Sequence, residues 1–264
     1  MSIYGNPVML GGSGGGGGGI PSGPSQPTGG SDGDLYVQTF PVATGVTYVE
    51  YLESSGTQYI DTGIIANQGT DVVCDCTYRG NDFIIGNRTG GATNASKALI
   101  VVGSGSGICA YKSNEQGTVA NYVASASAGD RCKSIIKTAK FQSAQTSLLV
   151  PREDASALYS KTLTSFTADY SQALFGLKQG SSVSVASRAT LHRVTYLQDG
   201  VPIHDYLPCL DTNGVPCMWD NIAKEYVYND GTGNFTYGSS VTPDELEPVL
   251  YQKVNGAWEV VAWA

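Results

Sequence analysis

The sequence predicts an all-β protein, either a sandwich or a barrel, and three observations lead to this prediction. Short segments of β-branched and aromatic residues alternate with polar ones along most of the chain. Turn pairs divide these segments, for example Asp-Gly at 199–200, Asn-Gly at 213–214 and Asp-Gly at 230–231. The best helical candidate, TPDELEPVL at 242–250, is short and is interrupted by Pro248.

The expected strands begin at Leu35 and follow one another at close spacing, as in sandwiches and barrels. They are LYVQTFPV (35–42), VTYVEYLE (46–53), TQYIDTGI (57–64), DVVCDCTY (71–78), DFIIG (82–86), KALIVVG (97–103), ICAYKS (108–113), CKSIIKTA (132–139), SLLVP (147–151), ALFGL (173–177), SVSVAS (182–187), ATLHRVTYL (189–197) and KEYVYN (224–229). The last residues, LYQKVNGAWEVVAWA, predict two more strands around an Asn-Gly turn. This pair either closes a hairpin on the sandwich or binds a neighbouring subunit.

Residues 1–34 are rich in Gly and Pro and hold too few apolar groups for a core, so they predict an extended arm or linker. Pro21, Pro24 and Pro27 recur every three residues, which is the period of polyproline II. A plain flexible spacer and an ordered three-stranded stalk both remain open. The apolar residues that would anchor the arm to a partner are Ile3, Tyr4, Pro7, Val8, Met9 and Leu10.

Charge and composition exclude several classes of protein. The formal net charge is -8, and the first basic side chain is Arg79, so nucleic-acid binding is not expected because it needs clustered cations. The N-terminus lacks a secretory pattern, and no segment approaches the ~18 apolar residues of a membrane span. We therefore expect synthesis in a cytoplasm, no membrane insertion, and buried thiols in place of disulfides or metal ligands.

Two segments carry a family likeness. YVEYLESSGTQYIDTGI at 48–64 resembles the first strands of the laminin-G or concanavalin A-like domains of gut bacteriophage and prophage proteins, and residues 189–238 resemble their end. The resemblance implies a two-sheet jelly-roll sandwich exposed on a phage particle. The expected organisation is then an attachment arm at 1–34, the concanavalin A-like sandwich at 35–240 and a C-terminal extension or hairpin at 241–264.

Catalytic patterns do not assemble into a coherent set, so a non-enzymatic protein is expected. No G-x-S-x-G pattern follows an expected strand as a nucleophile elbow would, and His192 and His204 lie at no metal-ligand spacing. The glycines after the 97–103 segment predict a hairpin loop because no helix follows to hold a pyrophosphate. A glycan hydrolase stays open as an alternative, with its paired carboxylates drawn from Asp61, Asp71, Asp75 and Asp82.

Aromatic residues suggest a glycan platform, because sugars stack on aromatic faces. The candidates are Tyr206, Trp219, Tyr226 and Tyr228. A place in the sandwich core or a subunit contact is the favoured interpretation of these residues, since large aromatics are mainly buried. No cofactor is expected. Turn oxygens could hold calcium, but the favoured interpretation is that these side chains form Asx turns that cap hairpins. The residues are Asp211, Asn213, Asn229 and Asp230.

Together these observations predict a virion structural protein, either an exposed fibre or a decoration protein of head or tail. The arm would dock on other virion proteins, and the sandwich would contact host-surface glycans. We expect a homo-oligomer, and a trimer would fit the three-residue period of the arm without being established by it. A purely architectural capsid, collar or tail protein that binds no sugar is the alternative.

Overall fold

All described parts of the chain are strands, turns or irregular segments, and no helix occurs among them. The computed structural model describes residues 22–23, 29–38, 43–80, 82–89, 97–104, 107–114, 117–122, 127–136, 157–159, 167–199, 201–242, 249–254 and 257–263. Within these ranges, nothing resembles an apolar helix of membrane-spanning length. The predicted all-β class is confirmed.

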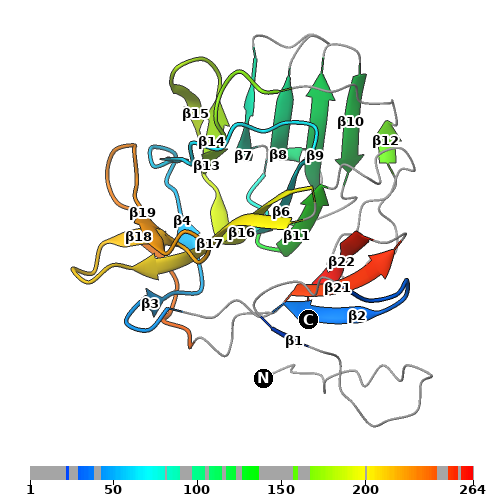
Figure 1. Cartoon of the computed structure of the whole chain (residues 1–264). Helices are drawn as coiled ribbons and strands as arrows, with labels where there is room; N and C mark the ends of the chain where they lie inside the picture. Colours follow the sequence, from blue (N-terminus) through cyan, green and yellow to red (C-terminus); the bar gives the residue numbers. More distant parts are fainter. Residues whose placement is uncertain are drawn as a thin grey trace.

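The first of two large sheets has nine strands and forms the upper part of the molecule in Figure 1. Its glycine-flanked hairpin, in which Ser104 pairs with Gly107, confirms the loop predicted after residue 103. In spatial order the strands are β12 (Ala157–Tyr159), β10 (Gly117–Tyr122), β9 (Gly107–Asn114), β8 (Ala98–Ser104), β7 (Phe83–Arg88), β13 (Ala173–Leu174) and β5 (Ile60–Asp61), with β14 (Gly176–Lys178) on β7 and β15 (Val183–Ala186) on β14.

The second large sheet also has nine strands, and its long antiparallel hairpin places Val194 opposite Tyr206. In spatial order the strands are β11 (Arg131–Ile136), β6 (Thr70–Thr77), β16 (Thr190–Gln198), β17 (Val201–Leu210), β18 (Pro216–Asp220) and β19 (Glu225–Val227). Three short strands complete it: β3 (Thr47–Tyr48) on β17, β4 (Leu52–Glu53) on β16 and β20 (Thr236–Tyr237) on β4.

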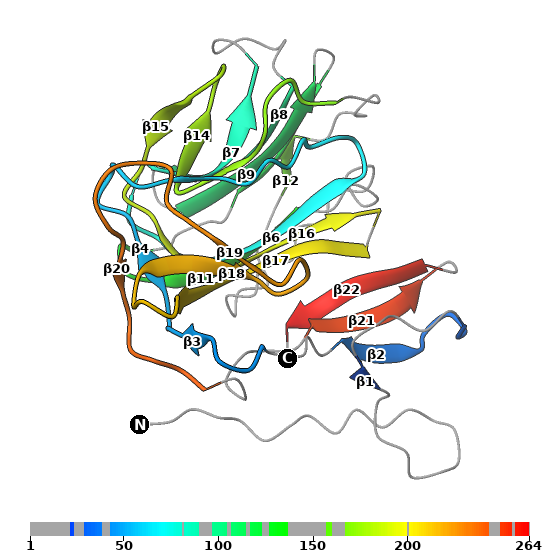
Figure 2. The same cartoon turned by 60° about the vertical axis from the view of Figure 1, so that its left-hand side comes forward.

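The two large sheets lie as separate layers in Figure 2, and one hydrophobic core joins them. Alternate residues of β6, Val72, Cys74 and Cys76, belong to this core, as do Ile85 and Leu99 from the opposite sheet. All five are completely buried. The period of two in the sequence therefore becomes the inner face of a β-sandwich, as predicted.

Polar residues on the opposite face of the second sheet are also buried, but they are paired. Arg193 contacts the carboxylate of Asp205 through two hydrogen bonds of 2.8 and 3.0 Å, and Thr195 donates to the same carboxylate. Arg131, whose side chain is about half exposed, holds the buried Asp75 in the same way, at 2.9 and 2.7 Å. Each of these buried carboxylates therefore has the partner that a charge out of water needs.

A third sheet lies outside the sandwich and changes the expected boundaries (Figures 1 and 2). Its strands are β1 (Ser22–Gly23), β2 (Leu35–Gln38), β21 (Val249–Val254) and β22 (Ala257–Trp263). The C-terminal hairpin is confirmed. However, β2, which we expected to begin the sandwich, pairs with β21, and Val249 and Leu250 of the helical candidate form a strand.

The opening and closing segments of the resemblance are bonded to each other, although about 170 residues separate them in the chain. The loop at 229–233 runs along residues 57–61 and completes their backbone hydrogen bonding. The bonds are Asp230 N to Tyr59 O (2.8 Å), Thr232 N to Thr57 O (3.1 Å), Thr57 Oγ1 to Thr232 O (2.9 Å) and Gln58 Nε2 to Thr232 O (3.0 Å).

The cysteines are buried free thiols wherever the structure describes their side chains, as predicted. Cys209 and Cys217 are cross-strand neighbours with their sulfur atoms 3.6 Å apart, beyond a disulfide bond. The five free thiols are Cys74, Cys76, Cys132, Cys209 and Cys217.

Candidate functional site

The second sheet presents an aromatic cluster on the face that points away from the core. Alternation along β18 places Met218 in the core between the sheets and Trp219 on the outer face. Tyr226 lies opposite Trp219 on β19, and Tyr228 follows two residues later on the same side. We call Trp219, Tyr226 and Tyr228 the aromatic ladder.

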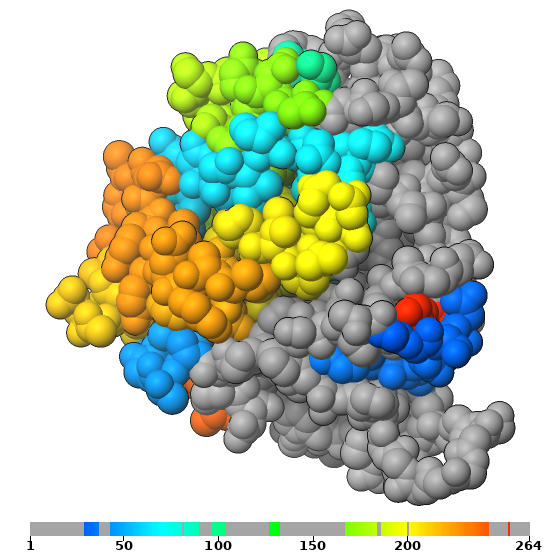
Figure 3. Space-filling model, in the orientation of Figure 1, coloured from blue at the N-terminus to red at the C-terminus, as the bar shows by residue number. Residues whose placement is uncertain are grey.

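The ladder runs from a buried end to an exposed end. The Trp219 and Tyr226 rings meet edge to face at 4.9 Å, and the Tyr226 and Tyr228 rings are 6.2 Å apart. Trp219 is only 8% exposed, Tyr226 is half-buried and Tyr228 is 46% exposed. Residues 201–242, coloured yellow to orange, form the surface at the left-hand edge in Figure 3. Tyr228 is therefore the most exposed ring of the ladder.

A fixed carboxylate lies beside the exposed end of the ladder. Asp211 Oδ1 accepts hydrogen bonds from the backbone N–H groups of Asn213 and Val215, both at 2.8 Å. Its Oδ2 accepts one from the Tyr228 hydroxyl at 3.2 Å. The Val215 N–H and the other donors hold the pKa of Asp211 below its ordinary value, so this carboxylate is ionised at neutral pH.

The structure separates Tyr206 from the other three predicted glycan-binding residues. Tyr206 is 2% exposed and lies in the core, where its ring meets Tyr196 edge to face at 6.3 Å. The half-exposed imidazole of His204 stacks on it at 5.6 Å. Tyr206 has therefore no free face for a sugar, and the core placement favoured for it is correct. The ladder lies on the outer face of the sheet, where Trp219 belongs to a second, smaller core cluster and Tyr226 packs against that cluster. The core placement is therefore also correct for Trp219, whereas Tyr228 is exposed.

Of the four residues considered for calcium, Asp211 and Asn229 cap turns in the structure, whereas Asp230 bonds to β5. Asp211 caps its own turn, and Asn229 Oδ1 accepts hydrogen bonds from the N–H groups of Tyr59 and Gly231, at 3.1 and 2.9 Å. Asp230 Oδ2 accepts from Asp61 N at 2.7 Å. Among the described residues, no group of three His, Cys, Asp or Glu side chains has the geometry of a metal site.

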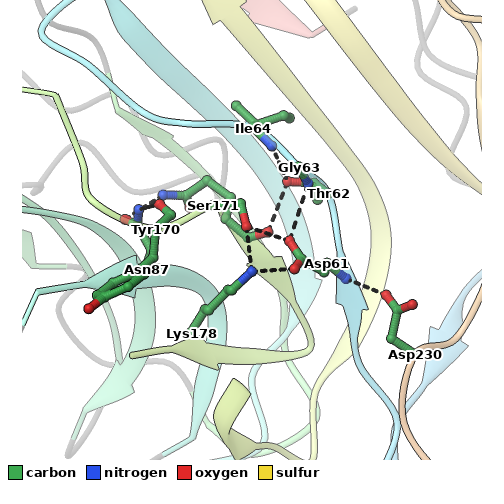
Figure 4. Close-up of polar contacts among 10 residues, drawn as sticks. Asp61, Thr62, Gly63, Ile64, Asn87, Tyr170, Ser171, Lys178 and Asp230 are labelled. Atoms are coloured by element: carbon green, nitrogen blue, oxygen red, sulfur yellow. Dashed lines mark hydrogen bonds and ion pairs between the residues drawn. The ribbon is translucent and has the colours of Figure 1, made fainter. Parts of the chain in front are cut away.

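A second polar cluster consists of Asp61, Ser171 and Lys178, on and beside β5, β13 and β14 (Figure 4). Lys178 donates to the Asp61 carboxylate and to Ser171 Oγ, the latter at 2.7 Å. Ser171 in turn donates to Asp61 Oδ1 at 2.6 Å. Burial raises the pKa of Asp61, but the hydrogen bonds from Lys178, Ser171 and Gly63 outweigh it, and the pKa lies below its ordinary value.

This arrangement resembles a serine–lysine dyad, but its hydrogen bonds hold the three side chains together and do not prepare Ser171 to lose its proton. A general base must accept the serine proton, and the group that accepts from Ser171 is a carboxylate of lowered basicity. Lys178 uses its ammonium protons as a donor to both partners. The cluster therefore joins strands through an ion pair.

Sequence reasoning missed the Asp61 cluster and the part that Asp211 plays. Ser171 and Lys178 lie 110 and 117 residues from Asp61, and no local spacing signals their contact. The sequence does predict Asp211 as a turn cap, and the bonds from Asn213 N and Val215 N confirm it, but nothing local signals its bond to the Tyr228 hydroxyl 17 residues away.

The predicted anchor residues Ile3, Tyr4, Pro7, Val8, Met9 and Leu10 lie outside the described residues, so their role stays a prediction. A scan against protein-family models and a search of curated protein sequences gave no match for this chain. The likeness to concanavalin A-like phage domains therefore depends on residues 48–64 and 189–238.

Proposed function

We propose that the chain is a bacteriophage virion protein, an exposed fibre or decoration protein, whose lectin-like sandwich contacts glycans of the host surface. The observation that carries the glycan-binding part is the aromatic ladder, which ends in the half-exposed Tyr228 beside the Asp211 carboxylate. An aromatic face next to a hydrogen-bond acceptor is what a pyranose ring with its hydroxyl groups needs.

The virion part of the proposal is supported by the two segments of the resemblance. These segments lie far apart in the sequence but bond to each other through residues 57–61 and 229–233. The concanavalin A-like jelly-roll topology belongs to the same proposal. We also include in it the docking of the arm on other virion proteins and the assembly of the chain into a homo-oligomer, a trimer.

The glycan-binding part is tested on a bacterial glycan array with the wild-type chain and two matched variants. Tyr228→Ala removes the exposed ring of the ladder, whereas Tyr237→Ala removes a tyrosine of similar exposure (48% against 46%) on β20. We expect wild type and Tyr237→Ala to bind the same spots and Tyr228→Ala to lose them. Equal loss in both variants, or none in either, would contradict the proposed site.

The virion part is tested by mass spectrometry of particles purified from the culture that produces the protein. Peptides of the chain should remain with the particles through density-gradient purification. Peptides found only in the cell lysate would contradict a virion role. Residues 1–34 contain no lysine, so the crosslinking reagent must react with carboxylates. On intact particles it should link Asp32 or Asp34 to another virion protein.

A further inference from the structure

The exposed end of the aromatic ladder carries a negative charge. Asp211 Oδ2 accepts from the Tyr228 hydroxyl, and the Asn213 side chain also hydrogen-bonds the Asp211 carboxylate. Oδ1 is held by two backbone N–H groups, which fix the direction of the carboxylate. A carboxylate of fixed direction therefore lies beside the Tyr228 ring, where the hydroxyl or acidic groups of a ligand would meet its charge.

The charge of Asp211 reaches both tyrosines of the ladder. Burial raises the pKa of Tyr228, and the hydrogen bond to Asp211 and its charge raise it further. In Tyr226, burial and the neighbouring thiols Cys209 and Cys217 raise the pKa, and Asp211 adds to the effect. At neutral pH the thiols are uncharged, so the negative charge that acts on the ladder is that of Asp211, within a chain whose formal net charge is -8.

We infer that the aromatic ladder selects neutral, hydroxyl-rich glycans and discriminates against acidic ones, such as those that contain uronic acids or sugar phosphates. This inference rests on the proposed glycan-binding function. A sugar that stacks on Tyr228 can donate a hydroxyl proton to Asp211 Oδ2. A carboxylate or phosphate at the same position meets a like charge, which discriminates between partners.

The size of the discrimination follows from one charge pair. Two like charges about 5 Å apart in water repel by roughly 0.8 kcal/mol, which corresponds to about a fourfold weaker affinity. The effect should be largest at low ionic strength, since salt screens charges over about 10 Å at 0.1 M.

The test compares acidic oligosaccharides with their methyl esters, which keep the sugar skeleton and lose the charge. Oligogalacturonates and their esters are immobilised side by side, next to neutral mannan and galactan oligosaccharides. Wild type should bind the esters about fourfold more tightly than the acids at low salt, with a smaller ratio at 0.5 M salt.

Asp211→Asn is the decisive variant, because it removes the charge and keeps the shape. The amide oxygen still accepts from Asn213 N and Val215 N, and the amide nitrogen can donate to the Tyr228 hydroxyl. The ester-to-acid ratio should fall to about one in Asp211→Asn and stay at about four in Tyr237→Ala. Equal affinity of wild type for acids and esters, or an unchanged ratio in Asp211→Asn, would overturn the inference while leaving glycan binding in place. Absence of binding to every glycan would contradict the proposed function as well.

Discussion

Gly231 lies where the closing loop crosses the opening strand, and replacing it with alanine should disturb that crossing. An ideal Cβ at this position would lie 2.1 Å from the carbonyl oxygen of Thr57 and 3.1 Å from Gln58 Cα. Both neighbours are backbone atoms, so no side chain can swing away. The loop at 229–233 must therefore move outward by about 1 Å to restore ordinary contact.

The movement has a cost that can be worked out from the contacts. Overpacking of this kind costs about 1–3 kcal/mol. It also weakens the bonds from Asp230 N to Tyr59 O and from Thr232 N to Thr57 O, each worth about 1 kcal/mol. Alanine regains about 0.4–1 kcal/mol by restricting the unfolded chain. The free energy of unfolding should fall by about 2–4 kcal/mol.

Thermal unfolding followed by circular dichroism measures this effect. For a chain of this size, we expect Gly231→Ala to lower Tm by about 5–15 °C. Gly29→Ala is the control, because an added Cβ there meets nothing within 4 Å, and it should change stability by less than about 0.5 kcal/mol. A Gly231→Ala protein that melts within about 2 °C of wild type would refute the argument that this crossing fixes the sandwich.

Three further predictions concern buried polar groups and thiols. Burial lowers the pKa of His192 below 6.5, so between 6.5 and that lower value the unfolded chain binds more protons than the folded one. The free energy of unfolding should therefore drop as the pH falls through this window. In His192→Gln, the urea midpoint should depend less on pH between pH 7 and 5. Asp205→Asn removes the carboxylate that two hydrogen bonds join to the buried Arg193 and should cost about 3–5 kcal/mol in urea unfolding. Glu53→Gln at the exposed pair with Arg79 should cost less than about 1 kcal/mol, and similar losses in both variants would contradict the difference in burial. The five buried thiols should resist a thiol reagent in the native protein and react after denaturation; they are Cys74, Cys76, Cys132, Cys209 and Cys217. Peptide mapping that finds any of them labelled in the native state would contradict their burial.

The fold class could be predicted because each strand reports it locally. DVVCDCTY became β6, with Val72, Cys74 and Cys76 in the core, since a period of two fixes which side chains share a face. The partner of each strand is not a local property. LYVQ at 35–38 reads as a strand, but only the chain's three-dimensional course pairs it with β21 instead of the sandwich.

For the same reason, the sequence predicts which ladder residues share a face but not which face of the sheet they occupy. The alternation in KEYVYN correctly places Tyr226 and Tyr228 on one face, but it cannot tell the inner face from the outer one. That choice depends on the pairing of β19 with β18, where Met218 faces the core between the sheets and Trp219 faces outward into a second, smaller core cluster. The hydrogen bond between Tyr228 and Asp211 depends on a turn that closes 17 residues away.

The affinity of Tyr228→Ala relative to Tyr237→Ala for one neutral glycan tests the central claim most directly. Isothermal titration calorimetry with the neutral oligosaccharide that binds wild type best would give both dissociation constants. Loss of the Tyr228 ring should weaken binding about tenfold, or ~1.4 kcal/mol, while Tyr237→Ala should match wild type. Equal dissociation constants for the two variants would contradict a glycan site on the aromatic ladder.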